Sequence, residues 1–263
     1  PGMAEYYIPR QIQTSLGESA ALESVVISHN RLTLRGLQIE DPESGRNLSF
    51  REIRFNLKFL NLLIYGLAPV NLVDEINVDD WIMEIYPPQA EPGAGTDFWE
   101  ALRRYPSIQQ INTTRGRISF YGNEIDSLFG WVEAVKPDSF LFDFSAYALR
   151  ADSANFRLTG WADTESELAE MRLHLAETLF PDDFQPVEGV KLPQGLIEAD
   201  VEGSIDGSAA AIYGTLGLNN TALDLGENSL IARDVDLQAE FFGDSVSASG
   251  SGSIYGQRME FKG

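Results

Sequence analysis

Two histidines, His29 and His174, are the chain's only imidazole groups. Each stands alone in its segment, and neither belongs to an H-x-x-x-H or H-E-x-x-H spacing that would hold zinc. The sequence contains no cysteine, so it offers neither a thiolate nucleophile nor a Cys-ligated metal site. We therefore interpret both histidines as surface or strand-flanking residues.

Adjacent carboxylates are the second group of residues that could do chemistry, as general acids and bases or as calcium ligands. Such pairs occur at Asp74-Glu75, Asp79-Asp80 and Asp182-Asp183. Consecutive residues of a strand point to opposite faces, so a pair within a strand lines one site only where the strand is irregular. With 40 acidic and 19 basic residues, neighbouring acids are also expected by chance. Solvated carboxylates explain these pairs.

The glycine-rich segments contain no motif for nucleotide binding or nucleophilic catalysis. Residues 203–208 lack the Gly-Lys-Ser/Thr ending of a P-loop, and the glycines of 250–256 have no Rossmann context. There is no G-x-S-x-G nucleophile elbow. The sequence therefore predicts a protein that is not an enzyme and needs no metal or cofactor.

Net charge narrows the classes of partner. The formal charge is −21, whereas nucleic-acid binding requires a basic surface, so nucleic acid is not expected as a partner. General attraction to an anionic bilayer is disfavoured for the same reason. No run of about 18 apolar residues is present. The 263 residues are enough for one elongated β domain over 1–263, with a candidate seam in the Pro-rich segment 181–193.

The elements that must position any site are mainly strands. Between Ser24 and Tyr86 apolar and polar residues alternate, which is typical of half-buried strands. The alternation shifts by one residue at Gly36, where we expect a β-bulge, and again at Asp79-Asp80. Further strands are predicted over residues 196–205, 209–218, 230–242 and 245–254. Their spacing favours an antiparallel meander and gives no sign of βαβ units.

Helices are expected in fewer places. Residues 4–22 have an apolar helical face and predict an N-terminal helix, and Thr96 caps a predicted short helix. Residues 61–73 fit either a strand running into a loop or a short helix, and we favour the strand and loop. Residues 164–180 fit a helix or a strand equally, and the pattern does not decide between them.

Several of these segments together resemble a known family. They are L-x-L-x-G-L-x-I at 32–39, D-P-x-x-G at 41–45, L-L-I-Y-G at 62–66, I-N-T-T-R-G-R-I-S-F-Y at 111–121 and Y-G-Q-R-M-E-F at 255–261. In this order they resemble the N-terminal region of AsmA-like proteins, the bacterial envelope group with TamB- and YdbH-type members. The resemblance is one of pattern and includes no catalytic signature.

The resemblance implies a fold and a function. The fold would be mostly β: an elongated, twisted and curled antiparallel sheet, open like a gutter, with an N-terminal helix and one or two short helices. The chain would be the periplasmic N-terminal fragment of a longer protein, held in the inner membrane by a preceding anchor helix. Such proteins are thought to carry phospholipid between envelope membranes along a hydrophobic groove. Phospholipid, the membrane and other envelope proteins are the implied partners.

The same apolar pattern also fits a closed β core in a structural or protein-binding module of the envelope. Under the groove hypothesis, the large apolar residues that alternate with polar ones form the lining. These residues are Leu32, Leu34, Leu37, Ile39, Ile53, Phe55, Leu57, Phe59, Ile118, Phe120, Phe140, Phe142 and Phe144. The two hypotheses differ in whether this face is covered.

Overall fold

The computed structural model describes most of the chain from Ala20 onward. The described residues are 20–41, 45–58, 73–86, 109–120, 123–136, 138–149, 151–180, 184–187, 190–192, 195–207, 209–224 and 231–263. Phe59 and the short helix predicted from Thr96 lie outside them, as does the ambiguous segment 61–73 except for its last residue. The predicted N-terminal helix also lies outside them, except at its end, where Ala20–Ala21 form a strand instead.

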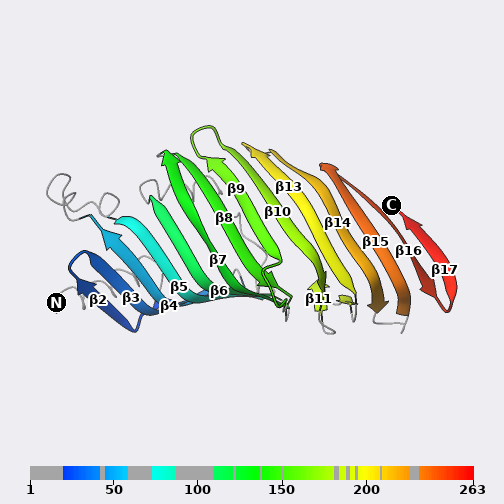
Figure 1. Cartoon of the computed structure of the whole chain (residues 1–263), viewed down its shortest axis with the longest axis horizontal. Helices are drawn as coiled ribbons and strands as arrows, with labels where there is room; N and C mark the ends of the chain where they lie inside the picture. Colours follow the sequence, from blue (N-terminus) through cyan, green and yellow to red (C-terminus); the bar gives the residue numbers. More distant parts are fainter. Residues whose placement is uncertain are drawn as a thin grey trace. The chain divides into compact units, whose positions relative to one another are not determined.

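The described residues form β-strands and no helix, which confirms the mostly β prediction (Figure 1). Within this part of the chain, no helix is therefore long and apolar enough to cross a membrane. In chain order the strands are β1 Ala20–Ala21, β2 Ser24–Ser28, β3 Arg31–Asp41, β4 Arg46–Leu57, β5 Val73–Ile85, β6 Gln110–Phe120, β7 Asn123–Lys136, β8 Ser139–Ala148, β9 Phe156–Asp163, β10 Leu168–Leu179, β11 Phe184–Val187, β12 Val190–Leu192, β13 Leu196–Asp206, β14 Ala209–Asp224, β15 Ile231–Gly243, β16 Ser245–Ile254 and β17 Gln257–Lys262.

The chain divides into two compact units, one formed by residues 1–119 with 127–141 and the other by 120–126 with 142–263. In the first unit, β2, β3, β4 and β5 pair in succession, and β1 pairs with the far end of β3. In the second unit, β9, β10, β13, β14, β15, β16 and β17 pair in succession, while β12 pairs with β11 and β14. Every one of these pairs is antiparallel, as the meander predicts. The segment 181–193 belongs to the second unit.

Residues 168–179 form strand β10, which resolves the ambiguity between helix and strand. Leu173 is paired with Leu158 on one side and with Val201 on the other. Good helix formers dominate this segment, but both neighbouring strands offer backbone partners along its length. Tertiary pairing therefore overrides the local helix propensity.

The bulge expected at Gly36 is absent, and this prediction is wrong. Arg35 pairs with Glu52 and Leu37 pairs with Phe50. Gly36 therefore lies opposite a single residue, Arg51, and neither strand has the extra residue that defines a bulge. Gly36 has a φ of +62°, a left-handed conformation that turns the strand by one phase without adding a residue. On the facing strand β4, the apolar positions also shift by one residue between Phe50 and Ile53. Because both strands shift at the same level, the pairing of β3 with β4 stays regular.

The second phase change, at Asp79-Asp80, is present and has the same physical basis. Asp80 has a φ of 55°, and Arg115 on β6 and Ser127 on β7 are also left-handed. Val78 and Trp81, on either side of the acidic pair, both lie on the apolar face. Asp79 and Asp80 consequently share the polar face, although they are adjacent in a strand.

Candidate functional site

In the first unit, the sheet is apolar on one face across four paired strands. The register places Val25, Leu34, Ile53 and Val78 next to one another on β2 to β5. Further rows on both sides extend this pattern along the strands. We call the surface the first apolar face. It contains Val25, Ile27, Leu32, Leu34, Leu37, Ile39, Leu48, Phe50, Ile53, Phe55, Leu57, Ile76, Val78, Trp81 and Met83.

The first apolar face is buried at its centre and partly accessible around it. Val25, Leu34, Leu37 and Ile53 form a buried cluster, with exposed fractions between 5% and 8%. Other predicted lining residues, such as Phe55, are half-buried. The structure therefore brings Leu32, Leu34, Leu37, Ile39, Ile53 and Phe55 together in one cluster. Leu57 follows on the same face and is also half-buried.

Trp81 extends the first apolar face to β6. Its indole N–H donates a hydrogen bond to the hydroxyl of Thr113, and its ring occupies the space where Gly116 has no side chain. Ile118 lies two residues beyond Gly116 on β6 and so faces the same side of the sheet. Phe140, on β8, is half-buried in the same unit.

The second unit has an apolar face of its own. Phe142 lies over Gly160 on β9, and Phe142 and Phe144 have ring centroids 6.2 Å apart. Gly160 pairs with Met171, and Met171 in turn packs beside Gly203 of β13. The second apolar face contains Phe142, Phe144, Phe156, Leu158, Met171, Leu173, Leu175, Val201, Ile212, Leu216, Leu237, Phe241 and Val246.

The predicted lining residues are divided between the two units. Phe142 and Phe144 are part of the second apolar face, and Phe120, the last residue of β6, also belongs to the second unit. The other described candidates belong to the first unit. The sequence prediction omitted most of the second apolar face, although β15 shows strict alternation around Leu237 and Phe241. Small residues between the large ones weakened this signal.

Burial along the second apolar face changes from one end of the strands to the other. At one end, two residues before Leu237, Val235 is fully buried and its cross-strand partner Thr221 is 1% exposed. Towards the other end of these strands, Ile212 on β14 is 44% exposed and Val246 on β16 is 60% exposed. The face therefore has a closed end and an open end.

In both units the opposite face of the sheet is mostly polar and carries ion pairs between neighbouring strands. Arg157 donates to Asp143 at 2.7 Å, and Arg172 contacts Asp200 at 3.1 Å. The hydrogen bonds that the two guanidinium groups donate to these carboxylates raise the pKa of both arginines, so both stay charged. His174 lies 3.9 Å from Asp200 on this exposed surface, in agreement with its interpretation as a surface residue. His29 is an exposed turn residue between β2 and β3.

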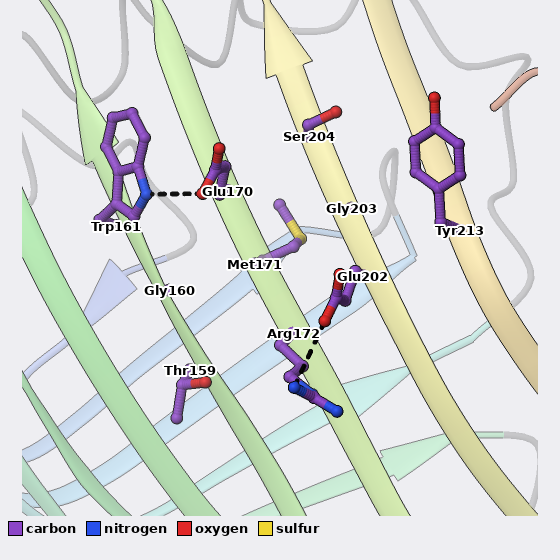
Figure 2. Close-up of a pocket in the computed structure, with 10 residues that line it drawn as sticks. All are labelled: Thr159, Gly160, Trp161, Glu170, Met171, Arg172, Glu202, Gly203, Ser204 and Tyr213. Atoms are coloured by element: carbon purple, nitrogen blue, oxygen red, sulfur yellow. Dashed lines mark hydrogen bonds and ion pairs between the residues drawn. The ribbon is translucent and has the colours of Figure 1, made fainter.

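A shallow hollow of about 420 Å³ lies in the second unit among Thr159, Gly160, Trp161, Glu170, Met171, Arg172, Glu202, Gly203, Ser204 and Tyr213. Figure 2 shows Trp161 and Tyr213 on opposite sides of these residues. The Trp161 indole donates to Glu170 at 3.0 Å, and Arg172 contacts Glu202 at 3.3 Å. Four of the lining side chains are thus engaged with one another in pairs.

The arrangement is suited to binding apolar chains. Among the residues that the structure describes, no group of three or more His, Cys, Asp or Glu could hold a metal ion. The two apolar faces instead offer large side chains in rows, on strands whose backbone groups are already paired. Such a surface can bind hydrocarbon without any directional chemistry.

Comparison with known proteins adds no identification: no protein-family model matches the chain, and no curated protein matches it.

Proposed function

We propose that this chain is the periplasmic part of an AsmA-like protein anchored in the inner membrane. In this proposal it binds phospholipid acyl chains in a hydrophobic groove and takes part in lipid transport between the envelope membranes. The observation that carries the proposal is the one-sided distribution of large apolar residues in both units. The lipid-binding role of this surface is inferred from the resemblance of the sequence to AsmA-like proteins.

The energetics of a partly accessible apolar face favour a hydrocarbon ligand. Phe55 and Leu57 in the first unit and Phe142 in the second are half-buried. Full burial of such a side chain contributes roughly 1.5–3 kcal/mol relative to full exposure. An acyl chain lying across several of them would remove their remaining surface from water. Large continuous apolar patches on proteins commonly mark sites of this kind.

The proposed mechanism is passive. Acyl chains lie against the apolar face in a curled, open sheet, and the lipid headgroup stays in water at its edge. No residue forms a covalent bond or transfers a proton to the lipid. The polar face, with ion pairs such as Arg172 with Asp200, stays hydrated.

A second candidate function is a structural or protein-binding module of the envelope with a closed core. The observation that favours it is the pair of buried clusters, one around Leu34 and Ile53 and the other around Phe180 and Leu192. In such a module the half-buried residues would be the margins of a core, and no lipid would be required.

An Asp substitution on the apolar face distinguishes the two candidates. An open groove lets water hydrate the new carboxylate in Phe55→Asp and Phe142→Asp, so the variants fold but lose bound lipid. In a closed core, an unpaired carboxylate costs several kcal/mol and unfolds the unit. Ser249→Asp, at an exposed position of β16 opposite Gln238 and Lys262, is the control for added charge.

The readouts are thermal unfolding and native mass spectrometry of co-purified phospholipid. Lipid on the unmodified chain, together with folded Asp variants that have lost it, supports the lipid-binding function. An unmodified chain that carries no lipid and takes none up from vesicles, with both Asp variants unfolded, rejects it in favour of the closed module.

A further inference from the structure

The open end of the second apolar face is bordered by three hairpin turns. These turns connect β9 to β10, β13 to β14 and β15 to β16. The first two are joined, because the N–H of Gly207 donates to the carbonyl of Glu167 at 2.9 Å. The third lies close to β14, where the ring of Tyr213 approaches Gly243. We call residues 163–168, 206–209 and 243–245 the hairpin edge.

All the charged residues of the hairpin edge and of the strand ends that lead to it are acidic. The segments 159–171, 203–213 and 240–250 contain no lysine or arginine. Their acidic residues are Asp163, Glu165, Glu167, Glu170, Asp206, Glu240 and Asp244.

These carboxylates differ in what they do. Asp163 accepts hydrogen bonds from the N–H groups of Glu165 at 3.1 Å and Ser166 at 2.9 Å, and so shapes its turn. Glu165, Asp206 and Asp244 are exposed at the same edge. Arg233, near the start of β15, and Arg258, near the start of β17, lie towards the closed end. Lys262 lies opposite Ser249 of β16, further from the closed end but outside the hairpin edge.

We propose that the second apolar face takes a zwitterionic phospholipid whose headgroup ends in an ammonium group, with that headgroup at the hairpin edge. The proposal rests on the proposed lipid-binding function and adds the orientation and the headgroup class. Acyl chains extend from the open end, near Ile212 and Val246, towards the closed end at Val235, where no further surface is accessible. The headgroup is thereby left beside Glu165, Asp206 and Asp244.

Charge complementarity selects the headgroup. An ammonium group at the hairpin edge lies beside carboxylates in segments that contain no lysine or arginine, whereas an anionic headgroup such as phosphatidylglycerol is repelled. The groups are exposed, so each interaction is weak and sensitive to salt. Three of them acting together are expected to give a preference of about fivefold for the zwitterionic lipid at low salt. At 1 M salt, where the screening length is about 3 Å, the preference disappears.

The test uses the full chain and three lipids with identical acyl chains: phosphatidylethanolamine, phosphatidylglycerol and diacylglycerol. Native mass spectrometry measures the ratio of the two bound phospholipids from an equimolar mixture, while diacylglycerol reports acyl-chain binding without a charged headgroup. One variant carries Glu165→Lys, Asp206→Lys and Asp244→Lys. The matched control carries Glu177→Lys, Glu198→Lys and Glu260→Lys, which make the same change in net charge at exposed positions away from the hairpin edge.

The proposal expects the hairpin-edge variant to lose or reverse the preference, with diacylglycerol binding unchanged and the control like the unmodified chain. Equal binding of the two phospholipids by the unmodified chain, with diacylglycerol bound, overturns the headgroup inference and leaves the lipid-binding function intact. An equal shift in both triple variants also overturns it, because net charge would then be the cause. Failure to bind any of the three lipids rejects the lipid-binding function itself.

Discussion

Arg51 on β4 donates a hydrogen bond of 3.0 Å to the carboxylate of Asp80 on β5. The two residues lie between the pairs Glu52–Asp79 and Phe50–Trp81, at the level where both strands change side-chain phase. Gly36 occupies the same level on β3. The phase change is therefore a feature of three adjacent strands, and it keeps apolar residues on one face without a register slip.

Substitutions at Asp80 test the backbone conformation behind this phase change. A left-handed φ of 55° costs roughly 1–2 kcal/mol for most residues and nothing for glycine. Asp80→Val is expected to destabilise the chain by at least about 1 kcal/mol, because a β-branched residue tolerates this conformation poorly. Asp80→Gly loses only an exposed ion pair and should stay close to the unmodified chain. Urea unfolding measures both, and equal losses would show that the conformation is not strained.

Two adjacent valines on β2 test which face of the first unit is buried. Val25 is 5% exposed and Val26 is 41% exposed. Val25→Ala removes two buried methyl groups and should cost about 1–3 kcal/mol, whereas Val26→Ala should stay within about 0.5 kcal/mol. The pair is matched in chemistry and in strand, so equal losses of unfolding free energy would contradict the assignment of the faces.

Local alternation was enough to predict most strands. The strands predicted over 245–254 and 209–218 begin where β16 and β14 begin, since turn residues interrupt the alternation there. The phase change at Gly36 is visible in the sequence, but nothing in the sequence connects it with Arg51, and a bulge is the simpler local explanation. Only the pairing of β3 with β4 shows that both strands turn together.

The candidate site was less predictable than the strands. Large residues such as Phe55 and Phe142 stand out, whereas a face with Gly160 and Gly203 between larger residues gives little periodic signal. Those glycines matter because Phe142 and Met171 lie over them, a relationship that depends on residues distant in sequence. Whether an apolar face is covered also depends on tertiary packing, which alternation does not encode.

At the end of β8, the side chain of Asn155 makes the hydrogen bonds to Ala148 that the backbone of a paired strand would otherwise make. Its side-chain oxygen accepts from the N–H of Ala148 at 2.7 Å, and its amide donates to the carbonyl of Ala148 at 3.1 Å and to Thr178 at 2.7 Å. Ala148 is 4% exposed, and its carbonyl still accepts from the N–H of Ala151 at 3.3 Å, so Asn155→Ala leaves the buried N–H of Ala148 without a partner. The change should cost about 1–3 kcal/mol. Thr178→Val removes only one of these bonds.

The measurement is the urea midpoint of both variants by circular dichroism. Asn155→Ala should unfold at clearly lower urea than Thr178→Val. If the two variants unfold together near the midpoint of the unmodified chain, water replaces the Asn155 side chain without cost, and its bonds to Ala148 do not stabilise the fold.

Adding a side chain at a glycine can cost free energy through backbone strain or through steric overlap. Gly214 on β14 and Gly256 in the turn between β16 and β17 distinguish these two effects. Both have a positive φ, of 124° and 78°. A Cβ at Gly214 would overlap the carbonyl oxygen of Asp200 on the paired strand, whereas a Cβ at Gly256 has no neighbour within 4 Å. Gly256→Ala therefore pays only the conformational cost, about 1 kcal/mol. Gly214→Ala must also move β14 away from β13, breaking ladder bonds, and should cost more than about 3 kcal/mol.

Unfolding free energies from urea denaturation give both values. A Gly214→Ala loss no larger than that of Gly256→Ala would mean that β13 and β14 are not held as closely as the pairing of Val201 with Gly214 requires.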